Sequence, residues 1–241
     1  MKWHIGCSGF SYREWKDVFY PPKLPQREWF NYYASRFSTL ELNVSFYRFP
    51  QLSMLQGWYD KSPAGFSFAV KAPRLITHFK QLVDCEKYLE DFYTVCRDGL
   101  KEKLGPLLFQ FPPAFHYTEE RLSRIISSLD GSFRNVVEFR HAGWWDKKVY
   151  TALEKQDLIF CGMSYPGLPD DVITTSPTGY YRFHGVPKLY YSEYDTAYLK
   201  RIADNMLKQK ELKSMYCYFN NTAALGAIAN AGWIENYIKE K

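Results

Sequence analysis

Short apolar or alternating runs recur along the chain, and segments of helical period separate most of them. A run that alternates every second residue predicts a strand, whereas apolar positions spaced three and four apart predict an amphipathic helix. Eight strands are expected, at residues 3–7, 39–43, 67–72, 106–111, 135–140, 159–164, 179–184 and 214–220. Helices are expected between them, at residues 27–37, 51–61, 85–103, 118–129, 147–156, 194–210 and 225–239.

This alternation predicts the fold class. Eight βα units in 241 residues are typical of a single (β/α)8 TIM-like barrel of the α/β class, which would occupy residues 1–241 as one domain. Residues 165–178, after the sixth strand, contain three prolines, so helix six is expected to be reduced or replaced by a loop. A doubly wound open sheet is the alternative, but Gly6-Cys7-Ser8-Gly9 lacks the G-x-G-x-x-G spacing of a dinucleotide-binding turn.

Polar residues gather at the ends of the predicted strands. In a barrel, alternate strand residues face the lumen, and active sites form at the C-terminal ends of the strands. Where the apolar residues of a strand face the helices, the intervening residues must face inward. This reasoning predicts an inward-facing cluster of Glu41, Asn43, Lys71, Gln110, Glu138, Arg140, Arg182, His184 and Asn220.

Two interpretations of this cluster remain open. It could be a structural ion network, with Glu138 paired to Arg140 or Arg182 and Glu41 paired to Lys71. The variety of its side chains favours a ligand site instead, in which the lysine and the arginines bind an anion such as phosphate and the carboxamides bind hydroxyl groups. The substrate-binding candidates are Tyr12, Asn43, His78, Gln110, Arg140, His141, Arg182, Asn220 and Asn221.

Two loops rich in aromatic residues are expected at the same face. The first covers residues 10–26 and includes Trp15 and Tyr20, and the second follows the seventh strand and includes Tyr190, Tyr191 and Tyr194. Aromatic walls beside polar groups can hold sugars or bases by stacking. The alternative is that these rings cap the barrel core.

The amino-acid composition excludes few classes of protein. With 46% hydrophobic and 24% charged residues, a chain of 241 residues can bury a large core without disulfides. The five cysteines are widely spaced, and neither a signal-peptide core nor an 18-residue apolar run occurs, so a cytoplasmic protein without a membrane partner is expected. The net charge of +5 is scattered along the chain, which makes nucleic acid a less favoured partner.

The predicted cluster suits acid–base chemistry of hydrolase or lyase type on a small anionic or polyhydroxylated substrate. The catalytic candidates are Glu41, Glu138, His184 and Lys71, with Glu138 or Glu41 expected as the acid–base group, and no tightly bound organic cofactor is expected. Glycoside hydrolysis is less favoured, because nearby arginines would lower both carboxyl pKa values whereas a general acid needs one raised. A Schiff base at Lys71 and a nucleophilic Cys7 are weaker alternatives.

Metal chemistry and binding without catalysis are further alternatives. His78, His141 or His184 could join a glutamate around a metal ion, but no H-x-H or H-E-x-x-H spacing occurs and the lumen cations would repel it, so no metal is expected. A non-catalytic nucleotide- or nucleic-acid-binding protein would use the same cations, amides and aromatic rings. The oligomeric state is left open by the sequence.

Several longer blocks of sequence resemble a known family. They are Gly6-Cys7-Ser8-Gly9-Phe10-Ser11-Tyr12, Glu41-Leu42-Asn43 followed by Phe46-Tyr47, Phe68-Ala69-Val70-Lys71-Ala72, Val137-Glu138-Phe139-Arg140-His141, Tyr181-Arg182-Phe183-His184-Gly185 and Tyr218-Phe219-Asn220-Asn221. On these blocks the chain is identified as a member of the YecE-like family, a widespread domain of unknown function. The resemblance implies a TIM-like barrel and no established reaction. Family members often carry an acidic residue near the end of the sixth strand, where this chain has Met163-Ser164-Tyr165-Pro166.

Overall fold

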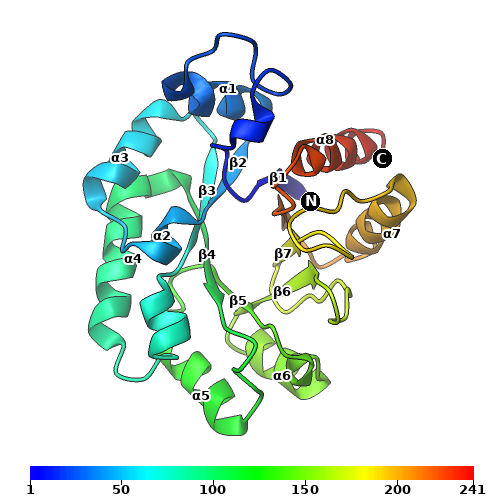
Figure 1. Cartoon of the computed structure of the whole chain (residues 1–241). Coiled ribbons are helices and arrows are strands. Elements are labelled where there is room, and N and C mark those ends of the chain that lie inside the picture. Colours follow the sequence, from blue (N-terminus) through cyan, green and yellow to red (C-terminus); the bar gives the residue numbers. More distant parts are fainter.

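Eight parallel strands form a nearly closed barrel surrounded by helices (Figure 1) in the computed structural model, which describes residues 1–241. The strands are β1 Lys2–Cys7, β2 Thr39–Leu42, β3 Ser67–Lys71, β4 Leu104–Gln110, β5 Asn135–Glu138, β6 Ile159–Ser164, β7 Thr178–Phe183 and β8 Ser214–Phe219. The helices are α1 Trp29–Arg36, α2 Val44–Tyr47, α3 Leu52–Lys61, α4 Glu86–Leu100, α5 Glu119–Ser128, α6 Lys147–Glu154, α7 Thr196–Leu207 and α8 Gly226–Lys239. The predicted (β/α)8 fold class is confirmed, including the absence of a helix between β6 and β7.

Most predicted strands extend one or two residues past the end of the observed strand. The backbone continues the ladder there in places: His184 N donates to Ser164 O at 3.0 Å, and Asn220 N donates to Phe183 O at 2.8 Å. These bonds fix the direction of the side chains at the mouth of the barrel. The four-residue α2 and a π-helical turn at Leu75–Phe79 were not predicted, because segments this short show no helical periodicity.

The lumen is filled by side chains and is not a pore. Its apolar part contains nine buried residues, including Tyr180, Tyr216 and Tyr218, and a second cluster of 51 buried residues contains most of the core. The inward-facing positions alternate along each strand as the pleat requires. The charged cluster lies at the C-terminal end of this filling and contacts it through Tyr180, whose hydroxyl donates to Glu41.

The barrel closes between β1 and β2 through a side chain. These strands share only an isolated bridge between Ser8 and Glu41. The Tyr33 hydroxyl accepts from Cys7 N at 2.7 Å and donates to Thr39 O at 3.0 Å, so it takes the place of a strand-to-strand hydrogen bond. The seam therefore depends on how closely the two strands can approach this hydroxyl.

Gly6 makes this close approach possible. A Cβ atom at Gly6 would lie 2.3 Å from Thr39 O and 2.8 Å from the Tyr33 hydroxyl. We expect Gly6→Ala to lower the free energy of unfolding by about 1–3 kcal/mol or more in urea denaturation, because backbone must move. Gly57→Ala is the matched control: Gly57 lies inside α3 with nothing within 4 Å, so it should raise stability by about 0.5–1 kcal/mol. Equal stability of the two variants would contradict the role of Gly6.

The aromatic loop after β1 packs into the core. Trp15 and Tyr20 are fully buried, and the Tyr20 ring stacks on Trp29 of α1 at a centroid distance of 4.6 Å. Trp15 Nε1 also donates to Ala224 O, just before α8, at 3.0 Å. For Trp15 and Tyr20, the alternative that the rings cap the core is the one observed.

The aromatic residues after β7 divide into two groups. Tyr194 is buried, and its hydroxyl accepts from Gly185 N at 2.7 Å and donates to Ser164 Oγ at 2.8 Å. Tyr190 and Tyr191 are exposed. Tyr194 therefore anchors the loop to the ends of β6 and β7, while its two neighbours remain open to solvent.

Candidate functional site

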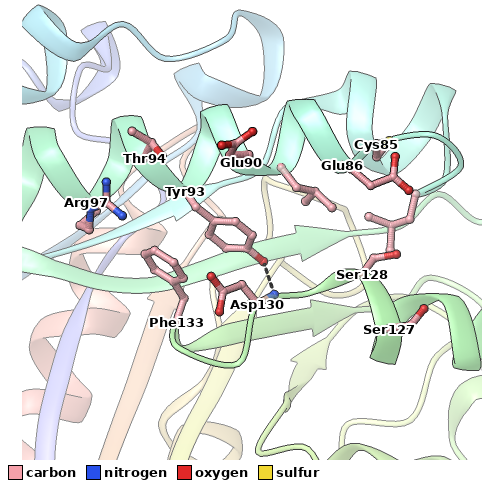
Figure 2. A pocket seen from close by; sticks show the side chains of 12 residues that line it. Cys85, Glu86, Glu90, Tyr93, Thr94, Arg97, Ser127, Ser128, Asp130 and Phe133 are labelled. Atoms are coloured by element: carbon pink, nitrogen blue, oxygen red, sulfur yellow. Dashed lines mark hydrogen bonds between the residues drawn. The ribbon is translucent and has the colours of Figure 1, made fainter.

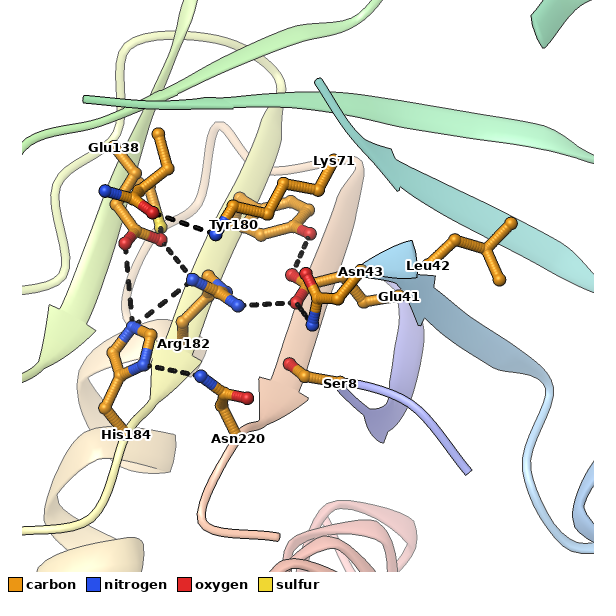
Figure 3. A network of polar contacts seen from close by, with 12 residues as sticks. Ser8, Glu41, Leu42, Asn43, Lys71, Glu138, Tyr180, Arg182, His184 and Asn220 are labelled. Carbon is orange, nitrogen blue, oxygen red and sulfur yellow. Dashed lines mark hydrogen bonds and ion pairs between the residues drawn. The ribbon is translucent and has the colours of Figure 1, made fainter. Parts of the chain in front are cut away.

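A buried ion cluster lies at the C-terminal end of the lumen (Figure 3), and Arg182 is at its centre. Its Nη2 is 2.6 Å from Glu41 Oε1, and its Nη1 is 2.7 Å from Glu138 Oε2. Arg140 Nε donates to the other oxygen of Glu138 at 2.6 Å. Glu41 also accepts from the Tyr180 hydroxyl at 2.7 Å. Residues from β2, β5 and β7 thus meet, as expected when parallel strands end at one face.

Lys71 is the exception, since no carboxylate contacts it. Its Nζ donates to Gln110 Oε1 at 2.8 Å and lies 4.0 Å from the centre of the Phe46 ring. The predicted pairing of Glu41 with Lys71 is therefore wrong. Glu41 is level with Ala69 in the β2–β3 register, so Lys71 lies two residues further toward the mouth. Arg182 reaches Glu41 from across the lumen instead.

His184 joins the cluster to the end of β8. Its Nε2 is 3.1 Å from Arg140 Nη2, and its Nδ1 is 3.0 Å from the amide of Asn220. Because arginine can only donate, Nε2 must accept; a neutral ring then carries its proton on Nδ1, and this tautomer requires the Asn220 carboxamide to present its oxygen to Nδ1 in place of Nδ2. Burial, reinforced by the charges of Arg140 and Arg182, holds the pKa of His184 well below its ordinary value. His184 therefore orients Arg140 as a neutral ring.

The pKa values of Lys71 and Glu138 are both lowered, for different reasons. Burial, together with the charge of Arg182, lowers the pKa of Lys71 from 10.5 to about 7. Burial alone would raise the pKa of Glu138, but Arg140 and Arg182 more than offset this effect and hold it below its usual range. Glu138 is thus ionised at neutral pH, whereas Lys71 can gain or lose a proton there.

The cluster consists of a buried layer and an accessible rim. The side chains of Glu41, Glu138, Arg182 and His184 are at most 1% exposed. The rim residues are Asn43, Lys71 and Asn220, which are partly exposed, and Arg140, whose side chain is 7% exposed. Of the four catalytic candidates, only Lys71 presents surface that a ligand could touch.

Two rim cations rest on aromatic rings that the strand pattern did not identify. The Arg140 guanidinium lies 4.1 Å from the centre of the Tyr165 ring, and Lys71 Nζ lies 4.0 Å from the centre of the Phe46 ring. Tyr165 and Phe46 lie just beyond β6 and β2, where strand parity no longer applies. Tyr180, by contrast, has the same parity as Arg182 and could have been found from the sequence.

A cavity of about 360 Å³ adjoins the cluster on the side of β1 and β2. Glu41, Asn43, Tyr12 and Trp58 are among its lining residues. Two buried polar atoms here have no hydrogen-bond partner, Ser8 Oγ and Asn43 Oδ1. Unsatisfied buried groups are rare in proteins, so these two atoms retain unused hydrogen-bonding capacity next to the cavity.

The other two histidine candidates, His78 and His141, occupy different environments. His78 lies at the rim, with Nε2 3.4 Å from the Gln110 amide, and burial together with the charge of Lys71 lowers its pKa to about 4. His141 instead accepts from Gly143 N and packs against His116, and it makes no contact with the cluster.

Asn221 does not face the site either. It is fully buried, and its amide donates to Ser192 O and Asn230 Oδ1, both at 3.0 Å. Asn221 directly follows Asn220, and adjacent residues of an extended chain point to opposite sides. The prediction that Asn221 contacts a ligand is corrected for this reason: its amide holds the loop that leads into α8.

A second cavity, of about 640 Å³, lies outside the barrel (Figure 2). It is lined by residues of α4, such as Glu90 and Arg97, and by the segment after α5, where Asp130 N donates to the Tyr93 hydroxyl at 3.3 Å. No residue of the ion cluster lines it. This cavity is therefore separate from the ion cluster.

Reactive cysteines, metal-ligand clusters and membrane-spanning helices are three features that the structure does not show. All five cysteines are free and buried, and burial raises the pKa of the Cys7 thiol, which makes it a poor nucleophile. The structure contains no group of three or more His, Cys, Asp or Glu side chains arranged to hold a metal ion. None of its helices is long and apolar enough to cross a membrane.

Comparison with known structures supports the fold. A DUF72 family protein from Thermotoga maritima is 26% identical, with a TM-score of 0.91 over 99% of this chain and 100% of that one. A DUF72 family protein from Enterococcus faecalis shares 19% identity, with a TM-score of 0.85 over 98% of this chain and 95% of that one, and shows likeness in fold alone.

Sequence comparison leads to the same group. UPF0759 protein YunF of Bacillus subtilis is 29% identical over 61% of this chain and 54% of its own length. UPF0759 protein YecE of Escherichia coli K12 is 26% identical over 63% of this chain and 54% of its own length. The chain therefore spans about half the length of these curated relatives. The family profile described as "Protein of unknown function DUF72" matches residues 4–241, and the chain belongs to this family.

Proposed function

We propose that the protein is an enzyme of hydrolase or lyase type that acts on a small anionic, polyhydroxylated substrate at the C-terminal mouth of the barrel. The charge balance of the cluster carries this proposal. Glu41 and Glu138 neutralise Arg140 and Arg182, which leaves Lys71 without a counter-charge. A buried ammonium without a partner is costly, and an anionic ligand would supply the missing charge.

Arg140 is the second group that would contact the anion. Its Nε and Nη2 engage Glu138 and His184, while the structure gives no partner for Nη1. A guanidinium held by a carboxylate and a ring offers its remaining N–H groups in a fixed direction, which suits phosphate or carboxylate.

The neighbouring cavity supports a substrate with hydroxyl groups. Ser8 Oγ and Asn43 Oδ1 lack partners, and a hydroxyl can donate to one and accept from the other. A volume of about 360 Å³ lies at the small end of ligand pockets. A compact sugar derivative or a small nucleotide fragment therefore fits better than a polymer.

Lys71 is the proton-transfer group in this proposal. A pKa of about 7 allows an amine to act as base or acid at neutral pH, whereas Glu138 stays ionised and would act by positioning Arg140. A glycoside hydrolase would need one carboxyl with a raised pKa, and Glu138 has the opposite shift.

Consumption of metabolites tests the proposal without a known substrate. The protein is incubated with a cell metabolite extract, and losses are followed by mass spectrometry. Wild type should consume at least one anionic metabolite, and Lys71→Met should reduce the rate by roughly 100-fold or more, because general acid–base groups contribute about 10²–10⁴-fold. Lys155→Met, at an exposed position after α6, should leave the rate unchanged.

Two outcomes would contradict the proposed function. Consumption that is undiminished in Lys71→Met removes the lysine from the reaction. Metabolites that are retained by the protein but never consumed favour the alternative of a nucleotide-binding protein without catalysis.

A further inference from the structure

Two lysines of this chain are largely buried, and they differ in how their amines are held. Lys103 Nζ donates to Tyr59 O at 2.7 Å, Ser62 O at 2.7 Å and Ser62 Oγ at 2.9 Å, so all three protons of its ammonium are engaged. Lys71 Nζ has one hydrogen bond, to Gln110, and a ring face. Lys103 is thus held as a structural cation, whereas Lys71 is positioned with its bonding capacity largely unused.

We propose that Lys71 forms an imine with an aldehyde or ketone substrate that carries an anionic group. This inference rests on the proposed function of the same site; it narrows the substrate class to carbonyl compounds and gives Lys71 a covalent role in place of proton transfer. Lys71 Nζ bonds Gln110, which is level with Glu138 in the β4–β5 register. Glu138 holds Arg140, so the amine and the guanidinium belong to adjoining parts of the mouth. In the proposal, one small molecule places its carbonyl at Lys71 and its anion at Arg140.

The surroundings of Lys71 favour the neutral amine that this reaction needs. Arg140 and Arg182 repel a third positive charge, and burial removes much of its hydration, while Glu41 and Glu138 are engaged by the arginines. The resulting pKa of about 7 leaves a large share of the amine unprotonated at neutral pH. An ordinary surface lysine is almost entirely protonated there.

The step balances without any further reactant. The Nζ lone pair attacks the carbonyl carbon, and a new C–N bond forms as the C=O π electrons move to oxygen. Both amine hydrogens leave with that oxygen as water, and the carbinolamine becomes a C=N double bond. No electrons are gained or lost overall. Once protonated, the imine withdraws electrons from the adjacent carbon, which is the requirement of lyase-type chemistry.

Reductive trapping tests the inference on the full-length protein. The probe is glycolaldehyde phosphate with sodium cyanoborohydride at pH 7.5, and peptide mass spectrometry locates the secondary amine formed. We expect the adduct on the peptide containing Lys71, at least roughly tenfold above Lys103 and the surface residue Lys155. Labelling at Lys71 should be half-maximal near pH 7, well below the pH at which an ordinary lysine loses its proton.

Gln110→Glu is the variant that keeps the lysine but changes its reactivity. It places a carboxylate where Lys71 Nζ now has an amide oxygen at 2.8 Å, so the ammonium becomes paired. Labelling of Lys71 at pH 7.5 should fall by at least about tenfold. Glycolaldehyde without phosphate should label Lys71 more weakly than the phosphate form, and this preference should disappear in Arg140→Gln.

The outcomes separate the inference from the proposed function. Labelling of Lys71 no faster than that of Lys155 would overturn the inference, even if metabolite consumption still depends on Lys71. Preferential labelling of Lys71 with no metabolite consumed would leave the reactive amine standing and would remove the proposed catalytic function.

Discussion

Glu138→Gln will lower the free energy of unfolding by about 3–5 kcal/mol, as expected when one partner of a buried ion pair is removed. Glu138 has no exposed surface, and its two oxygens engage Arg140 and Arg182. Glutamine keeps the shape but removes the charge, so Arg182 is left with Glu41 alone. Urea denaturation at pH 7 measures the loss.

The matched control is Glu90→Gln on α4. Glu90 is 72% exposed, and its oxygen is 3.5 Å from Lys87 Nζ, so its loss should cost at most about 0.5 kcal/mol. The contribution of the Glu138 carboxylate to the free energy of unfolding should remain constant from neutral pH down to about pH 4. Its pKa is lowered in the folded state, so its stabilisation is present above the unfolded pKa near 4 and is lost only as pH falls below that value. A loss below about 1 kcal/mol for Glu138→Gln would mean that water reaches the cluster.

Lys71→Met will change how the free energy of unfolding depends on pH above neutrality, whereas the pH dependence due to Glu138 appears only in acid. The pKa of Lys71 is lowered to about 7 in the folded protein, and it is near 10.4 in the unfolded chain. Below pH 7 both states are protonated, and the folded state bears the cost of an unpaired ammonium. As pH rises from 7 toward 10, the folded state releases the proton first, so wild type gains stability that the methionine variant cannot gain.

The size of this effect follows from the two pKa values. Between pH 6 and pH 9 the stability of wild type minus that of Lys71→Met should rise by about 2–3 kcal/mol, at about 1.4 kcal/mol for each pH unit above 7. Urea denaturation at both pH values provides the measurement, and the same difference for Lys155→Met should stay flat. A flat result for Lys71→Met would show that Lys71 remains charged at pH 9, and it would also weaken the case for a reactive amine.

Stability and reactivity at Lys71 have one physical origin. Both carboxylates of the cluster pair with arginines, so no carboxylate pairs with Lys71. Burial of the unpaired ammonium is unfavourable, and this lowers the pKa of Lys71. A ligand that brings an anion to Arg140 would partly restore this balance and raise the pKa of Lys71. Proton exchange at the lysine would then be coupled to binding.

Sequence periodicity was sufficient to predict the barrel and the set of residues that face its mouth. Parity along each strand is a local property, because successive side chains must alternate between the helices and the lumen. This is why Glu41, Glu138 and Arg182 could be placed together from residues far apart in the chain. The same rule explains two misplaced candidates, since His141 and Asn221 each follow an inward residue and so point away.

Only the tertiary structure decided which charges pair and which groups a ligand can reach. Pairing depends on register and on reach across the lumen: Glu41 is level with Ala69, so it meets Arg182 of β7 and not Lys71 of β3. The rings under Lys71 and Arg140 come from the four-residue α2 and from the residue after β6, where the segments are too short for a sequence period to predict the side-chain direction. Local pattern therefore determined the direction of each strand side chain, and three-dimensional distance determined that Lys71 is the one cation of the ion cluster without a carboxylate partner.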